Sequence, residues 1–265
     1  MLAPRIIPCL LVHNKGLIKT VKFDKEKGKY VGDPINAVKI FNEKEADELM
    51  VLDIDATVEN REPDYKMIEH IANECRMPLC YGGGIKTVEQ AQKIFNLGVE
   101  KIALSSAVIE KPSLVSQIAK EVGNQSVVVV IDVKKKLFGG YDIYTHNGTK
   151  KQKLSLENFI KEIQKLGVGE IVINSIDNDG VMKGYDIGLI SKLKPLIFTP
   201  LTVLGGAGTV EDIKNLVKEF GIIGCAAGSL FVFKGKYKAV LINYPKEDEK
   251  KKIINELDLK VFRQN

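Results

Sequence analysis

Carboxylates that follow buried apolar runs are the residues of this chain best placed to do chemistry. Asp132 ends the apolar run SVVVVID, where an unpaired carboxylate would be costly. We interpret Asp132 as a general acid or base, the alternative being an aspartate that caps a turn or a helix. Asp177 and Asp179 occur in the sequence SIDNDG, which is as typical of a turn as of a site.

Two groups of glycine and serine residues could bind phosphate. A triple glycine follows one apolar run and a serine pair follows the next, and a double glycine and a Gly-Ser pair follow two later runs. Glycine lets backbone N–H groups approach phosphate oxygens, although a tight turn also favours glycine. Because the arrangement occurs twice, it predicts an elongated ligand with a phosphate at each end. The predicted phosphate-binding residues are Gly84, Ser105, Ser106, Gly180, Gly206, Gly228 and Ser229.

Eight short apolar runs must position these residues. They are 5–12, 48–55, 78–83, 101–106, 127–133, 170–176, 201–206 and 222–228. Amphipathic segments lie between them, at 34–45, 87–97, 113–122, 155–166, 187–193 and 209–219. Nearly continuous apolar runs are typical of strands covered on both faces, so eight strand–helix units predict a closed parallel (βα)8 TIM barrel. An open doubly wound sheet is the alternative, but no GxGxxG sequence follows the first run.

The sequence also repeats at an offset close to 122 residues. GGGIKTVEQAQKIFNLGVEKIALSSA at 82–107 resembles GGAGTVEDIKNLVKEFGIIGCAAGSL at 205–230. LDIDATVENREPDY at 52–65 likewise resembles NSIDNDGVMKGYDI at 174–187. Half a barrel cannot bury its open sheet edges alone. We therefore predict one domain over 1–265, made of half-barrels at about 1–123 and 124–245 and followed by a C-terminal helix over 246–265.

Composition limits the classes of function. The chain has 265 residues, of which 45% are hydrophobic and 28% charged, as is typical of a globular protein. A net charge of +5, spread along the chain, indicates anionic ligands only weakly and does not favour a nucleic-acid partner. No apolar stretch reaches 18 residues, so we expect no membrane partner. Neither the four cysteines nor the three histidines have metal-type spacing, so we expect free thiols, a cytoplasmic location, no metal and no cofactor.

Nine segments point to a known family. They are RIIPCL, KYVGDP, DELMVLDIDAT, YGGGIKT, VEKIALSSA, VVVVIDVK, GEIVINSIDNDGVMKGYD, GGAG and CAAGSLF. Over essentially its whole length the chain resembles the cyclase subunit of imidazole glycerol phosphate synthase, and it matches the related isomerase of histidine biosynthesis less well. The resemblance implies a barrel that receives ammonia from a glutaminase subunit docked on its N-terminal face. In that family the ammonia attacks a doubly phosphorylated ribulosyl-aminoimidazole carboxamide, giving imidazole glycerol phosphate and an aminoimidazole carboxamide ribotide.

The resemblance also implies roles for individual residues. Four charged residues, each at the N-terminal end of a predicted strand, would gate the ammonia entrance; they are Arg5, Glu48, Lys101 and Glu170. A salt-bridge network without any transport role is the alternative. Lys19 matches a lysine of the family's mobile substrate-contacting loop, and Asp132 matches one of two catalytic aspartates.

The other catalytic aspartate is missing. The family's CLDV-type sequence is replaced here by Cys-Leu-Leu-Val, so Leu11 stands where the carboxylate is expected. Leucine cannot transfer a proton, and loss of a general acid or base typically costs about 10²–10⁴-fold in rate. His13 could substitute only if its side chain reached the same strand face. Leu204 also replaces a small polar residue that is common in the family.

Three functions therefore compete. A retained ring with a lost carboxylate favours a paralogue that acts as an ammonia conduit and glutaminase activator. Such paralogues accompany a third, ATP-dependent amidotransferase and are associated with amidino-sugars of surface polysaccharides or flagellin glycans. The alternative is an authentic cyclase of histidine biosynthesis with altered acid–base chemistry. A non-catalytic barrel that senses a phosphorylated small molecule is the third hypothesis, and it predicts no glutaminase partner.

Overall fold

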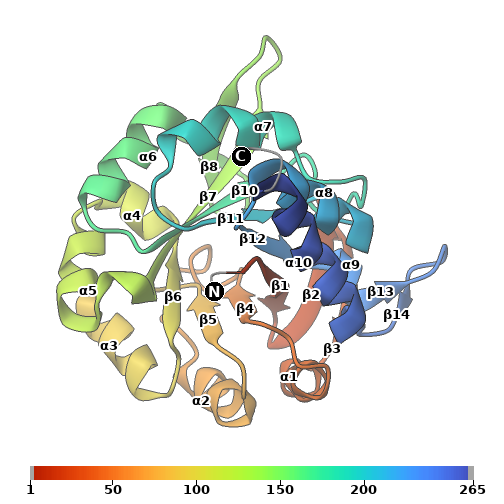
Figure 1. The fold of residues 1–265 in the computed structure, drawn as a ribbon. Coiled ribbons are helices and arrows are strands. Elements are labelled where there is room, and N and C mark those ends of the chain that lie inside the picture. The colour runs from red at the N-terminus through yellow and green to blue at the C-terminus, as the bar shows by residue number, and fades with distance from the viewer. Residues whose placement is uncertain (1–2, 262–265) are drawn as a thin grey trace.

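The computed structural model describes residues 3–261, which form a closed barrel of eight parallel strands surrounded by helices (Figure 1). The barrel strands are β1 (Arg5–His13), β4 (Leu49–Asp53), β5 (Leu79–Gly82), β6 (Lys101–Leu104), β7 (Val127–Lys135), β10 (Glu170–Ser175), β11 (Leu201–Leu204) and β12 (Gly224–Ala227). The barrel closes because β1 pairs with both β12 and β4 while β7 pairs with both β6 and β10. The (βα)8 prediction is therefore confirmed.

Helices cover the outside of the barrel. They are α1 (Pro34–Glu43), α2 (Tyr65–Glu74), α3 (Val88–Asn96), α5 (Leu114–Val122), α6 (Leu156–Lys165), α7 (Ile187–Leu193) and α8 (Val210–Phe220), with short pieces α4 (Ser106–Glu110), α9 (Ser229–Val232), η1 (Asn124–Ser126) and η2 (Lys194–Leu196). The final helix α10 (Glu247–Val261) falls within the predicted 246–265, whose last four residues lie outside the described ones. The amphipathic pattern missed α2, whose only fully buried residues are Ile68 and Ile71. Across residues 3–261, none of the helices combines the length and the apolar character needed to cross a bilayer.

Antiparallel hairpins extend the barrel at the carboxyl ends of its strands, and the sequence pattern did not predict them. β1 continues into β2 (Gly16–Val21) and β3 (Asp24–Gly32), and β7 continues into β8 (Tyr141–Thr145) and β9 (Lys150–Lys151). After β12, β13 (Phe233–Lys234) pairs with β14 (Ala239–Val240). β3 is largely exposed and rich in lysine, and β9, β13 and β14 are only two residues long, so no apolar run marks them. We call the end of the barrel that these hairpins surround the mouth.

Local structure recurs at the offset found in the sequence. Thr87 and Thr209, 122 residues apart, each begin a helix with a capping box, in which the hydroxyl accepts the N–H of the third helical residue. Asp64 and Asp186, also 122 residues apart, each cap the next helix in the same way. Duplicated half-barrels require such matches, and the boundaries of the two halves stay a prediction.

The interior of the barrel is an apolar column. It contains Ile7, Cys9, Met50, Cys80, Ala103, Val128, Val130, Val172, Leu204 and Ala226. Leu11 and Leu52 pack against this column at the mouth, and a larger apolar cluster lies between the strands and the helices. As the sequence predicted, the four cysteines are free thiols. The column separates two polar regions, one at each end of the barrel.

Candidate functional site

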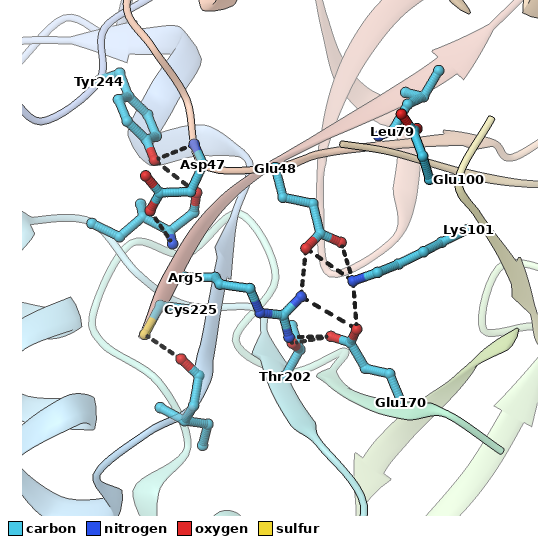
Figure 2. A network of polar contacts seen from close by, with 12 residues as sticks. Arg5, Asp47, Glu48, Leu79, Glu100, Lys101, Glu170, Thr202, Cys225 and Tyr244 are labelled. Atoms are coloured by element: carbon cyan, nitrogen blue, oxygen red, sulfur yellow. Dashed lines mark hydrogen bonds and ion pairs between the residues drawn. The ribbon is translucent and has the colours of Figure 1, made fainter. Parts of the chain in front are cut away.

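A ring of four charged side chains lies at the N-terminal end of the barrel (Figure 2). Arg5 donates a hydrogen bond to Glu48, and its Nη2 donates to Glu170 Oε1 at 2.8 Å. Lys101 Nζ lies 2.9 Å from Glu48 Oε1 and 2.9 Å from Glu170 Oε2. Each cation therefore contacts both carboxylates, so the structure brings together all four residues that the sequence singled out.

Pairing keeps the ring charged although it is largely buried. The side chains of Glu48 and Glu170 are only 4% and 5% exposed. Burial opposes the charged form of Glu170, but Arg5 and Lys101 outweigh it and hold the pKa of this carboxyl below its ordinary value. Burial likewise opposes the charge of Lys101, yet Glu170 and Glu48 raise its pKa. A buried charge is tolerated when it is paired in this way.

Thr202, on β11, is a fifth member of the ring that sequence reasoning missed. Its fully buried hydroxyl donates to Glu170 Oε1 at 2.5 Å and lies 3.4 Å from Arg5 Nη2. Gly224, on the neighbouring strand, makes room for it, since a Cβ there would lie 1.8 Å from Thr202 Oγ1. The signal available in the sequence was a threonine inside the otherwise apolar segment PLTVL.

Beside the ring, side chains join β1 to the start of β4 (Figure 2). The ladder between these strands begins further along the barrel. Here Asp47 accepts the N–H of Ile6 at 2.9 Å. The Tyr244 hydroxyl accepts the N–H of Asp47 at 3.0 Å and donates to the carbonyl of Ile6 at 2.8 Å. These bonds fix the chain neighbours of Arg5 and Glu48, and so position the ring.

At the opposite end, a cavity opens in the mouth and gathers part of the predicted site. Its lining includes Leu11, Lys19, Gly84, Ser105, Ser106, Asp132 and Gly228. Gly180, Gly206 and Ser229 are not among the lining residues. Gly180 has φ +69° and packs against the backbone of Thr20, while Gly206 packs against the carbonyl of Gly184. The first predicted phosphate-binding cluster, with Gly84, Ser105 and Ser106, therefore faces the cavity. Gly180 and Gly206 instead allow close contacts between backbone segments.

Asp132, on β7, has the environment of a general acid or base. It pairs in register with Asn174 on β10, whose Nδ2 donates to Asp132 Oδ1 at 2.8 Å. Burial raises the pKa of Asp132 to about 7; the Asn174 hydrogen bond opposes this shift and the nearby Asp179 adds to it. A carboxyl group with such a pKa can take up or release a proton near neutral pH.

Leu11 occupies the equivalent place in the first half of the chain. It pairs in register with Leu52 on β4, just as Asp132 pairs with Asn174 on β10. Leu52 and Asn174 are 122 residues apart, which matches the repeat in the sequence. Both leucines line the cavity. This wall is therefore apolar where the opposite wall carries an acid–amide pair.

His13 does not bring a second acid or base to the lining of the cavity. Its Nδ1 lies 2.8 Å from Asp55 Oδ1, and His13 is not among the residues that line the cavity. Asp55 also accepts a hydrogen bond from Lys25 Nζ at 2.6 Å. His13 thus belongs to a polar network at the base of the first hairpin. In the described part of the chain, no three His, Cys, Asp or Glu side chains are grouped to hold a metal ion.

Lys19 reaches the cavity from β2, a strand rather than the predicted loop. Its side chain is buried, and Nζ donates to the carbonyl of Cys9 at 2.5 Å. The amine lies over Gly228, at the place a Cβ would need. Burial lowers the pKa of Lys19, and the nearby Cys9 and Asp179 only partly oppose this shift. Lys19 therefore places a buried amine at the edge of the cavity.

Comparison with known proteins gives the family. Residues 5–238 match the family described as "Histidine biosynthesis protein", and the chain belongs to this family of (βα)8 barrels. It is 65% identical over 255 residues to the "Putative imidazole glycerol phosphate synthase subunit hisF3" of Vibrio vulnificus (strain YJ016), covering 96% of this chain and 97% of that protein. It is 51% identical over 245 residues to the "Putative imidazole glycerol phosphate synthase subunit hisF2" of Pseudomonas aeruginosa, with 92% and 97% covered. The "Imidazole glycerol phosphate synthase subunit HisF" of Natranaerobius thermophilus is 38% identical over 247 residues, with 93% and 97% covered. The resemblance seen in the sequence is confirmed.

Proposed function

We propose that this chain is the barrel subunit of a glutamine-dependent amidotransferase and conducts ammonia without performing the cyclisation. A glutaminase subunit docks at the N-terminal end and supplies the ammonia. The observation that carries the proposal is the contrast between the two ends of the barrel. The charged ring at the entrance is complete, whereas at the mouth Leu11 faces the cavity where a second proton-transferring group would be needed.

The ring is suited to admit a small neutral molecule. Lys101 contacts both carboxylates through a single amine, so withdrawal of this amine would open the ring while Arg5 still holds Glu48 and Glu170. Beyond the ring the interior column is apolar. An apolar column penalises the ammonium ion far more than neutral ammonia. Ring and column together support passage of ammonia in its neutral form.

The mouth is suited to bind an anionic ligand and to hand the ammonia on. Gly84, Ser105 and Ser106 line the cavity and would hold a phosphate group of a small molecule. Occupancy of this site would activate the glutaminase. The ammonia would then be consumed by a third, ATP-dependent amidotransferase, in the synthesis of an amidino-sugar for surface polysaccharide or flagellin glycans.

An authentic cyclase is the second candidate. The names of the relatives favour it, as does Asp132, whose pKa of about 7 suits proton transfer. In that case the chain would make imidazole glycerol phosphate and aminoimidazole carboxamide ribotide. Of the family's two catalytic aspartates it would have only the one that Asp132 matches.

Mixing the purified chain with its glutaminase and the doubly phosphorylated family substrate separates the two candidates. We expect glutamine hydrolysis to rise when the barrel is added, with little or no imidazole glycerol phosphate formed. Formation of this product at rates ordinary for the family would contradict the conduit, and absence of any complex with a glutaminase would contradict both candidates.

A second experiment tests the ring itself. Arg5→Ala should alter the delivery of ammonia through the barrel without abolishing the binding of a phosphorylated ligand at the mouth. Arg5→Lys keeps a charge there, so it guards against a folding defect. Arg76→Ala is the matched control, because Arg76 is exposed and is not part of the ring. Unchanged coupling in both Arg5 variants would favour a purely structural salt-bridge network.

A further inference from the structure

The positive charge of the chain is concentrated around the mouth rather than spread along the sequence. Residues 15–32, which form the first hairpin, hold six lysines and two acidic residues; residues 134–153 hold six lysines and one acid; residues 233–241 hold three lysines and no acid. The whole chain has 39 basic and 34 acidic residues. The remainder of the molecule therefore carries 24 basic and 31 acidic residues, so it is net negative while the hairpins are strongly positive.

The tips of two hairpins also expose large apolar side chains. Leu137 and Phe138, at the turn between β7 and β8, are 90% and 97% exposed, and Tyr237, between β13 and β14, is 89% exposed. Lysines flank both tips, at 134–136 in one and at 236 and 238 in the other. Adjacent large apolar side chains that are exposed and rimmed by polar residues are typical of interaction sites.

Contacts between the hairpins make them one surface. Lys29 Nζ donates to the carbonyl of Lys238 at 2.9 Å and lies over the Phe233 ring, which joins the first hairpin to the last. The turn between β8 and β9 crosses the mouth, where Asn147 donates to the carbonyl of Ile54 at 2.7 Å and Gly148 packs against Phe23 of the first hairpin. We call the three hairpins, 15–32, 134–153 and 233–241, the basic rim.

We propose that the basic rim is the docking surface for the protein that consumes the ammonia, and that this partner presents an acidic face. This inference rests on the proposed function, since only a barrel that does not use its own ammonia needs a partner over the mouth. Apart from the buried Lys19, the lysines of the rim are available to select an acidic surface. The apolar tips need a macromolecule to bury them, because a small anion would leave them in water. In Figure 1 the two tips project from the barrel in different directions, which suits a concave protein surface better than a flat lipid bilayer.

The test uses the chain in complex with its glutaminase and, as probe, the purified ATP-dependent amidotransferase that the proposed function requires. The variant K134E/K135E/K136E should raise the dissociation constant by about 10-fold or more at low salt, mainly through slower association, and the effect should shrink at high salt. The variant L137S/F138S should raise it by about 10-fold at every salt concentration, through faster dissociation. The control K120E/K161E/K218E reverses three exposed lysines on α5, α6 and α8 and should bind like the wild type.

Three results separate the explanations. If the amidotransferase binds but the rim variants behave like the control, the docking surface is wrong while the proposed function stands. If the barrel and its glutaminase make imidazole glycerol phosphate without a third protein, the proposed function fails whatever the rim variants do. Sedimentation with phosphatidylglycerol vesicles provides the last arm: vesicle binding that the rim variants lose, together with unchanged amidotransferase binding, would make the rim a lipid surface and overturn the inference.

Discussion

The strand pairs β1–β4 and β7–β10 occupy equivalent places in the two halves of the barrel, yet they are alike at only one end. At the N-terminal end, Glu48 and Glu170 are 122 residues apart and accept hydrogen bonds from the same two cations. At the mouth, Leu11 and Leu52 face the cavity from one pair, whereas the other pair carries Asp132 and its partner Asn174.

This difference has a physical reason in the packing around each end of the barrel. Leu11 and Leu52 pack against the apolar column, so leucines at the mouth extend a cluster that the fold already needs. Leucines on this wall therefore suit the packing of the barrel, although a leucine side chain cannot transfer a proton. The ring is constrained instead, because each of its carboxylates is buried against two cations and the loss of any member strands a charge.

The largest effect is expected when the apolar wall is rebuilt as a copy of the polar one. The double variant Leu11→Asp/Leu52→Asn places a carboxylate and its amide partner opposite Asp132. A second positioned acid or base is worth about 10²–10⁴-fold in rate. With glutaminase and the family substrate, we expect at least about 100-fold more imidazole glycerol phosphate than the wild type makes, measured by product chromatography.

Two controls make this gain specific. Leu11→Asn/Leu52→Asn adds polarity without a titratable group and should leave the rate at the wild-type level. Asp132→Asn introduced into the rebuilt barrel should remove the gain. A wild-type rate that already equals that of the rebuilt barrel would contradict the view that Leu11 is the limiting residue.

The next effect concerns the end where the two halves agree. Glu48→Ala and Glu170→Ala each leave Arg5 and Lys101 short of a buried partner, which typically costs about 3–5 kcal/mol in the free energy of unfolding. Glu170→Ala should cost about 1 kcal/mol more, because it also leaves the buried Thr202 hydroxyl without its acceptor. Urea unfolding measures both. The control adds Thr202→Val to each variant. If the unfolding costs of Glu48→Ala and Glu170→Ala are the same with and without Thr202→Val, Thr202 does not support the ring.

Sequence patterns predicted the parts of this molecule that repeat or that are continuously apolar. The eight runs became the barrel strands, and the four charges of the ring met because strand starts share one end of a barrel. Thr202 was missed because its role depends on the space left by Gly224 on a neighbouring strand, which is a contact between distant residues. Which glycines of the predicted phosphate set line the cavity could not be told from the sequence for the same reason: a glycine such as Gly206 has one signature whether it approaches a ligand or another backbone segment. The hairpins were missed because β3 is lysine-rich and other strands, such as β13 and β14, are only two residues long, so they carry no apolar run.

The polar wall also predicts a pH dependence that the apolar wall lacks. The folded chain raises the pKa of Asp132 from 3.8 to about 7, so it holds this proton more tightly than the unfolded chain does. The resulting stability is present in full below about pH 4 and is lost as the pH rises through about 7. Asp132→Asn should therefore gain stability relative to the wild type as the pH rises from 4 to 8. Thermal unfolding at a series of pH values measures this gain. Leu11→Asn, which puts the same amide on the other wall, should show no such change with pH, and a flat difference for Asp132→Asn would refute the shift.

The smallest difference between the halves should appear at two equivalent helix caps. Asp64 and Asp186 each accept the N–H of the third residue of their helices, and replacing such a cap by alanine typically costs about 1 kcal/mol. Asp186 also accepts the hydroxyl of Tyr141 at 3.0 Å, which ties the second hairpin to α7. Asp186→Ala should therefore cost about 2 kcal/mol in urea unfolding and Asp64→Ala about 1 kcal/mol. In a double-mutant cycle, Tyr141→Phe should cost about 1 kcal/mol in the wild type and close to nothing beside Asp186→Ala, whereas beside Asp64→Ala its cost should be unchanged.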